Sequence, residues 1–212
     1  MAQLSAEQIT DKALEMIDQD GLEELSMRRL GKALEVDAKA IYYYFPNKDS
    51  LIEAVLKRAF AEMDLPETQD SPWQNQLHTL AHTYYQLAST HPHLLQYLLR
   101  FDGTVPIVFD VVERIIVALH DTGLSAQSLI QVIDLFWSFV PSFAFDDPSL
   151  APESNTLHKQ LQQLSHDRFP ATRALLTHVS MDDLEGDLDF QIKLVIWGIE
   201  KLIEKEASDR GP

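Results

Sequence analysis

Three consecutive tyrosines, at positions 42 to 44, are the residues whose chemistry is easiest to name, and lysines stand on both sides of them. Phenol hydroxyls and ammonium groups donate hydrogen bonds to phosphate oxygens, while side chains that reach base edges read a DNA sequence. A helix of about two turns that exposes three tyrosines is too short to be a core element. The pattern therefore favours a short helix that inserts into a major groove.

The residues around these tyrosines predict a helix-turn-helix. Ser26 is a favourable N-cap for a first short helix, and Asp37 is one for a second. Pro46 ends the second helix, because proline has no N–H and restricts the residue before it. Asn47 can cap the helix that follows. A helix over residues 5–20 is expected to brace this unit from behind.

Two runs carry a resemblance to the TetR family of transcriptional repressors: SMRRLGKALEV, from Ser26 to Val36, and IYYYFPNKDSL, from Ile41 to Leu51. In that family a tyrosine, a variable residue, an aromatic residue or histidine, an apolar residue and a downstream lysine recur. The matching residues here are Tyr42, Tyr43, Tyr44, Phe45 and Lys48.

The resemblance implies an all-α protein. An N-terminal three-helix helix-turn-helix domain is expected over residues 1–46, a connecting helix over 47–65, and a larger helical effector-binding and dimerisation domain over 66–212. Apolar residues recur three or four positions apart after the linker at 64–71, and this spacing also predicts helices. These helices are expected over residues 72–87, 90–102, 104–122, 125–140, 156–168 and 188–206, with a shorter one near 175 and with Pro141 kinking or ending the fourth.

Eight residues are candidate DNA contacts. Lysine can donate to guanine and alanine can contact a thymine methyl, so Lys39, Ala40 and Tyr43 are assigned to base edges. The phosphate contacts are assigned to the guanidinium of Arg28, the ammonium of Lys48 and the hydroxyls of Tyr42 and Tyr44. With Ser26 at the start of the first helix, the full set is Ser26, Arg28, Lys39, Ala40, Tyr42, Tyr43, Tyr44 and Lys48.

Two residues depart from the family pattern. Glu35 stands at the turn position that glycine usually occupies, and a positive φ there would cost about 1 kcal/mol relative to glycine. Gly31 stands where alanine is common, which would allow the two helices to pack closely.

Charge is distributed unevenly along the chain. The formal net charge is −16, yet residues 26–58 contain seven basic and four acidic side chains. A locally positive end on an acidic body can orient a protein toward DNA, whereas the simpler interpretation is that the acidic surface keeps the protein soluble.

The 212 residues include no cysteine, which excludes disulfides, thiolate metal sites and cysteine nucleophiles. No membrane span or export signal is recognised, so a cytoplasmic protein is expected.

The C-terminal part supplies two further sets of candidates. Apolar helices over 125–140 and 188–206 are expected to form a dimer surface, as they do in the family, although burial within one subunit is the alternative. The dimer candidates are Leu129, Ile133, Leu188, Ile192, Val195, Ile196, Ile199, Leu202 and Ile203. The family generally senses small, often hydrophobic or planar molecules, and core packing is the competing interpretation for each pocket residue. The effector candidates are His78, His82, Tyr85, Phe101, Phe109, Val112, Phe136 and Trp137.

The predicted function is a homodimeric regulator, in the family's manner a repressor, that binds palindromic double-stranded operator DNA and is released by a small apolar or planar effector. One alternative is a dimeric regulator without an effector. Another is a metal-responsive regulator, because His78 and His82 have the i, i+4 spacing of a metal pair. The sequence positions no carboxylate beside these two histidines to complete a set of metal ligands, so neither a metal site nor a cofactor is predicted. An enzyme is not expected, since no phosphate-binding loop, nucleophile elbow or zinc-protease motif is present.

Overall fold

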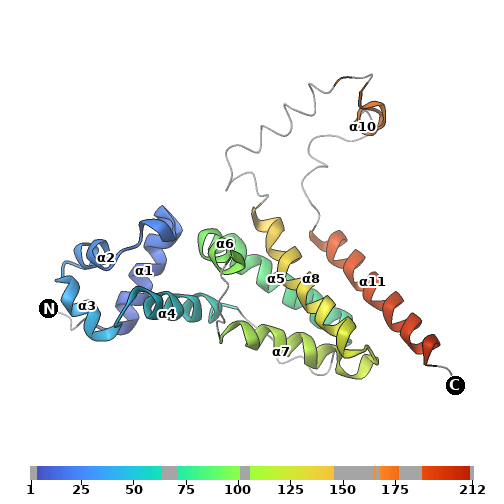
Figure 1. Ribbon diagram of the computed structural model, residues 1–212, viewed down its shortest axis with the longest axis horizontal. Helices are drawn as coiled ribbons and strands as arrows, with labels where there is room; N and C mark the ends of the chain where they lie inside the picture. Colours follow the sequence, from blue (N-terminus) through green and yellow to red (C-terminus); the bar gives the residue numbers. More distant parts are fainter. Residues whose placement is uncertain are drawn as a thin grey trace.

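The computed structural model describes residues 4–63, 71–100, 106–145, 165, 168–176 and 188–210. All regular structure in these ranges is helical, which confirms the expected fold class. The N-terminal helices lie at one end of the molecule and α11 lies at the other (Figure 1). The N-terminal elements are α1 (Ala6–Asp20), the short 3-10 helix η1 (Leu22–Glu24), α2 (Met27–Ala33), α3 (Ala38–Tyr44) and α4 (Lys48–Phe60).

Local capping explains where the N-terminal helices begin. The Ser26 hydroxyl accepts from the N–H of Arg29 at 3.2 Å, and the Asn47 side chain accepts from Ser50 N–H at 2.7 Å. The Asp37 carboxylate accepts from the N–H of Lys39 at 2.8 Å. Each cap satisfies a backbone donor that has no partner within its helix, which contributes about 1 kcal/mol. The caps predicted from the sequence are therefore confirmed at α2, α3 and α4.

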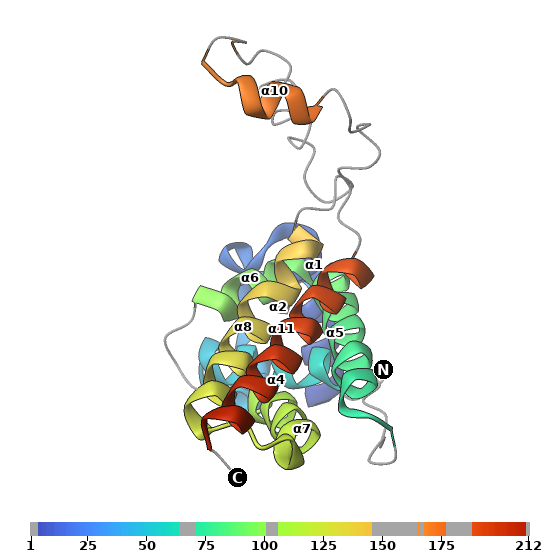
Figure 2. The same ribbon diagram turned by 90° about the vertical axis from the view of Figure 1, so that its right-hand side faces the viewer.

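The C-terminal helices pack around the pair formed by α5 and α8. Helix α5 contacts α8 more extensively than any other element, and α6, α7 and α11 pack around the two (Figures 1 and 2). These elements are α5 (Trp73–Thr90), α6 (Pro92–Arg100), α7 (Val108–Leu119), η2 (His120–Thr122), α8 (Ala126–Phe145), α10 (Pro170–Leu176) and α11 (Leu188–Asp209).

One apolar core runs through both parts of the molecule. It extends from α1 and α4 into α5, α7 and α8, and its fully buried members include Ile17, Val55, Tyr84 and Ile115. Burial of such side chains away from water supplies most of the drive to fold.

Helix α8 continues through Pro141 to Phe145, so of the two effects expected of this proline, kinking or ending the helix, the second is wrong. The expected helix over 156–168 lies almost entirely outside the described residues. None of the described helices is long and apolar enough to cross a membrane.

Candidate DNA-binding and effector sites

The turn between α2 and α3 depends on close backbone approach. The N–H of Val36 donates to the carbonyl of Gly31 at 2.9 Å. A Cβ added at Gly31 would lie 3.0 Å from the Val36 oxygen and 3.1 Å from the Ala38 nitrogen. Both neighbours are backbone atoms, which cannot move aside as the end of a side chain can. Glycine at this position therefore permits the close packing of the two helices, as expected.

Glu35 adopts the left-handed conformation, with φ of 56°. Its N–H still donates to the carbonyl of Lys32, at 3.2 Å. The expected cost of this backbone at a non-glycine residue, about 1 kcal/mol, therefore applies here. The side chain is exposed, so the turn presents one negative charge to solvent.

Helix α3 presents its aromatic face to solvent. Tyr43 is 84% exposed and Tyr42 is 49% exposed, whereas Ile41 and Phe45 are buried at 0% and 8%. The two inward residues are spaced four apart, so one turn of α3 packs on the core while Tyr42, Tyr43 and Lys39 project away from it. A large aromatic side chain exposed to this extent marks a surface built for contact. This is the geometry that insertion into a groove requires.

Tyr44 and Lys48 have partners within the protein. The Tyr44 hydroxyl donates to the carbonyl of Leu4, which fastens the start of the chain to α3. A phenol has one proton, so Tyr44 would donate to a phosphate only by giving up this bond. Lys48 donates one of its three ammonium hydrogens to the carbonyl of Leu22 at 3.2 Å and retains two for other acceptors.

Two of the arginines in the basic stretch are paired with the protein's own carboxylates. Arg29 lies 2.9 Å from Asp20 and also contacts Glu24. Arg58 pairs in the same way with Asp11 at 2.9 Å and with Glu62 at 2.8 Å.

Arg28 and Lys39 differ from these arginines. Both are exposed, and in the described part of the chain neither has a carboxylate partner. Their charges therefore remain available to phosphates. Both residues belong to the set of DNA contacts predicted from the sequence.

A buried histidine joins the two parts of the molecule, and sequence reasoning did not identify it. His91, between α5 and α6, is 4% exposed. Its Nδ1 lies 2.9 Å from a carboxylate oxygen of Asp18 on α1, and its Nε2 lies 3.2 Å from Glu62, just after α4. Burial opposes the charged form, but the hydrogen bonds of Asp18 and Glu62 outweigh it and hold the pKa of His91 above its ordinary value.

Two of the aromatic residues predicted for the effector pocket, Phe136 and Trp137, lie in a stack between α4, α5 and α8 with Tyr84 and Phe60, which the sequence did not single out. Tyr84 is fully buried and packs against Trp137, with ring centroids 5.1 Å apart, and against Phe136 at 6.2 Å. Trp137 also stacks on Phe60 of α4 at 6.5 Å. Burial raises the pKa of the Tyr84 phenol, and among the described residues its hydroxyl has no hydrogen-bond partner. An orphan hydroxyl of this kind costs about 1–3 kcal/mol.

The other effector candidates do not join this stack. Tyr85 packs partly buried against the core, Val112 is half-buried on α7, and Phe109 is 56% exposed. Phe101 lies outside the described residues. His78 and His82 face α11 instead.

A small apolar cavity does lie between α5, α8 and α11. Its volume is about 20 Å³, which is room for about one water molecule. Phe136 is the one effector candidate among its lining residues. The other effector candidates in the described part of the chain therefore do not line this cavity.

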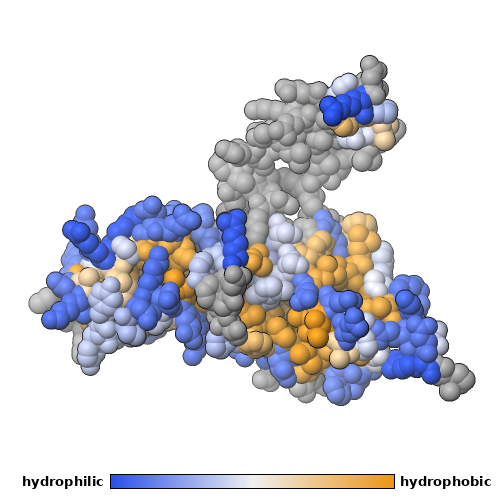
Figure 3. Space-filling model, in the orientation of Figure 1, coloured by the Kyte–Doolittle hydropathy of each residue, from blue (hydrophilic) through white to orange (hydrophobic). Residues whose placement is uncertain are grey.

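Helices α8 and α11 lie side by side at the end of the molecule away from α3 (Figures 1 and 2), and apolar side chains gather over this part of the surface (Figure 3). On α11, Phe190, Leu194 and Trp197 are 51%, 48% and 55% exposed. On α8, Ile130 and Leu135 are 59% and 44% exposed. An open groove of about 620 Å³ runs between the two helices.

The dimer candidates on α11 are less exposed than these residues, and Val195, Ile199 and Leu202 among them line the same groove. Ile192, Ile196 and Ile199 are buried within the subunit, which is the alternative that the sequence left open for the dimer candidates. Their spacing follows the stripe that packs on α5, while a second apolar stripe points outward. The remaining candidates are half-buried, and they are Leu188, Val195, Leu202 and Ile203 on α11 with Leu129 and Ile133 on α8.

Comparison with known proteins agrees with this arrangement. Residues 9–55 match the family model described as bacterial regulatory proteins of the tetR family. Residues 65–203 match the model of the tetracyclin repressor-like C-terminal domain. A curated relative is the HTH-type transcriptional repressor DrrR1 of Streptomyces coeruleorubidus, 23% identical over 99% of this chain and 82% of its own length.

Solved structures share the fold. ActR of Streptomyces coelicolor in complex with actinorhodin has a TM-score of 0.72 and 25% identity over the whole of both chains. BioQ with its double-stranded DNA operator has a TM-score of 0.60 and 22% identity over 76% of this chain and 97% of its own. The chain therefore belongs to the tetR family of bacterial regulatory proteins, and it is a DNA-binding transcriptional regulator rather than an enzyme.

Proposed function

We propose that the protein is a homodimeric repressor that reads a palindromic operator with α3 and leaves it when a small planar or apolar effector binds the C-terminal helices. The observation that carries the proposal is the pairing of two exposed surfaces at opposite ends of one continuous core. One is the tyrosine-rich face of α3, and the other is the apolar face of α8 and α11. This function places the protein in the cytoplasm, where its operator lies.

A second copy of the chain is the occupant that suits the α8 and α11 face. Two apolar helices from each subunit form a four-helix bundle across a two-fold axis. Gly198 supports this occupant, because glycine inside a helix costs about 1 kcal/mol relative to alanine. A Cβ at Gly198 would meet nothing within 4 Å in the single chain, so packing within the subunit does not require glycine there. Close approach by the helix of a partner subunit would require it.

DNA reading by this dimer assigns the sequence candidates to two roles. Tyr43, Lys39 and Ala40 reach base edges, while Arg28 and Tyr42 contact phosphates from the same face. Ser26 caps α2 and so holds the start of that helix in place. Lys48 contributes a phosphate contact with its remaining hydrogens. A two-fold dimer then requires half-sites about 34–36 Å apart, or a multiple of that distance.

The effector is expected at the stack of Tyr84, Phe136 and Trp137. An aromatic ligand that separates these rings gains stacking contacts, and an acceptor on the ligand satisfies the Tyr84 hydroxyl. The complex of ActR with actinorhodin supports an effector for this chain as well.

Two contacts would transmit effector binding to the DNA-binding end. Trp137 stacks on Phe60 at the end of α4, so displacement of the indole moves α4 and with it α3. The contact between His91 and Asp18 fixes the position of α1 against the α5–α6 junction during that movement. An effector releases the operator only to the extent that it binds the non-binding conformation more tightly.

A thermal-shift screen tests the effector part of this proposal. Planar aromatic compounds are mixed with the purified chain, and a ligand that binds the folded state raises its Tm. Hits are then added to the complex of the protein with DNA selected by it, and release is followed by fluorescence anisotropy. Trp137→Leu should abolish both the Tm rise and the release, whereas Phe109→Leu, on the exposed face of α7, should retain them. Compounds that raise Tm without releasing DNA would contradict the coupling.

A further inference from the structure

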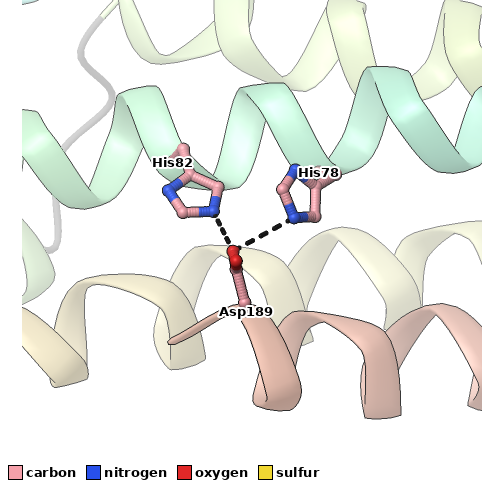
Figure 4. A group of neighbouring side chains, drawn as sticks. All are labelled: His78, His82 and Asp189. Carbon is pink, nitrogen blue, oxygen red and sulfur yellow. Dashed lines mark hydrogen bonds and ion pairs between the residues drawn. The ribbon is translucent and has the colours of Figure 1, made fainter. Parts of the chain in front are cut away.

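His78 and His82 lie one turn apart on α5 and converge on a residue distant in sequence. Their rings are 4.6 Å apart, and both face Asp189 in the first turn of α11 (Figure 4). His82 Nε2 is 2.5 Å from the Asp189 Oδ1 oxygen, and His78 Nε2 is 3.2 Å from the same oxygen. The carboxylate that sequence reasoning could not find is therefore present.

We propose that His78, His82 and Asp189 form a binding site for one divalent transition-metal ion of the Zn²⁺ class, with at least one coordination position open. The site joins α5 to α11 and is separate from the aromatic stack of Tyr84. The proposal does not depend on how the protein reads DNA or on which effector it senses.

The spacing of the three groups fits such an ion after a small adjustment. One ligand atom from each residue lies within 4.8 Å of the others. A tetrahedral site with bonds of about 2.1 Å needs ligand atoms about 3.4 Å apart. The His78 distance already meets this value, and the carboxylate must withdraw from His82 by about 1 Å. The half-exposed side chains can make that shift without disturbing the core.

The donor set selects the class of metal. Two imidazole nitrogens and one carboxylate oxygen suit Zn²⁺, Co²⁺, Ni²⁺ or Cu²⁺, whereas Mg²⁺ and Ca²⁺ prefer oxygen ligands. The Asp189 carboxylate already lies within hydrogen-bonding distance of both imidazoles. Lys193, one turn further along α11, carries a positive charge that opposes an incoming cation. The ion must therefore be one that binds imidazole strongly.

A bound ion would fix α11 against α5 beside the groove of the proposed dimer face. The contact between the two helices already includes a hydrogen bond from Gln74 to Glu200 at 3.0 Å. A metal ion would add a second link at the other end of that contact. The open coordination position faces solvent, where water or a donor atom of a ligand can complete the shell.

The test uses the full chain without an affinity tag, stripped of metal with a chelator. Zn²⁺ is titrated by calorimetry, and Co²⁺ binding is followed by its visible absorption. The expected result is one ion per chain, with a tetrahedral Co²⁺ spectrum and a rise in Tm. His82→Gln and Asp189→Asn should each weaken binding by about tenfold or more. His93→Gln, an exposed histidine on α6, is the matched control and should bind as the wild type does.

Three results would overturn the proposal. The first is no saturable binding of Zn²⁺ or Co²⁺ by the folded wild-type chain. The second is equal loss of binding in the His93→Gln control. The third is a Tm of the wild type that metal leaves unchanged, together with a lower Tm of Asp189→Asn in the metal-free protein. That result would mean that the three residues only form hydrogen bonds between α5 and α11.

Discussion

His91→Gln should destabilise the protein most at low pH, because it removes a buried positive charge that two carboxylates hold. Glutamine keeps a similar volume and can still donate a hydrogen bond, but it cannot be charged. The folded-state pKa of His91 is raised, so its contribution to stability is fully present below the unfolded pKa of about 6.5. That contribution is lost as the pH rises through the folded pKa.

The structure limits the size of this effect. Removing one partner from a buried ion pair costs about 3–5 kcal/mol. The side chains of Asp18 and Glu62 are 27% and 39% exposed, so water recovers part of their solvation and we expect about 2 kcal/mol. For a chain of this length, that corresponds to a fall in Tm of about 4–8 °C.

Chemical denaturation and calorimetry between pH 5.5 and 9 measure the effect, with His93→Gln as the exposed control. The difference in unfolding free energy between wild type and His91→Gln should be largest at pH 5.5 and should shrink as the pH rises. The control should show little difference at any pH. A His91→Gln effect that is independent of pH, or that grows with pH, would refute the account of His91 as a buried cation.

Four further substitutions test other parts of the structure. Gly31→Ala should destabilise the protein by about 1–3 kcal/mol in urea titrations, since its Cβ would press on backbone atoms. Glu35→Gly should stabilise it by about 1 kcal/mol in the same titrations, because glycine tolerates the positive φ. Tyr84→Phe should raise the unfolding free energy of the ligand-free protein by about 1 kcal/mol by removing an orphan hydroxyl. Gly198→Trp should shift the dimer to monomer in sedimentation velocity, whereas a dimer that tolerates this substitution would not use the α8 and α11 face.

The DNA-binding end could be predicted from the sequence because its determinants are local. The caps at Ser26, Asp37 and Asn47 bond to backbone groups two or three residues away, so they are visible as residue types at fixed spacing. The backbone strain at Glu35 and the close approach at Gly31 follow from the turn between two predicted helices.

The remaining features depend on contacts between distant residues. Asp189 meets His82 across 107 positions, and His91 meets Asp18 across 73. Neither pairing follows from helix periodicity, which fixes the face of a residue but not the element that packs on that face. Helix α11 shows the same limit, because it has two apolar stripes and periodicity does not say which one packs within the subunit. The regular stripe at Ile192, Ile196 and Ile199 is internal.

The most direct test of the central claim is selection of DNA from a random pool by the purified protein at fixed, moderate salt. The account predicts enrichment of a short palindrome whose half-sites are about 34–36 Å apart, or a multiple of that distance. It also predicts loss of that enrichment in Tyr43→Ala but not in Phe109→Ala, which removes an exposed aromatic ring from α7. A folded protein that enriches no palindrome, or a Tyr43→Ala variant that selects the same sequence as the wild type, would contradict DNA reading by α3.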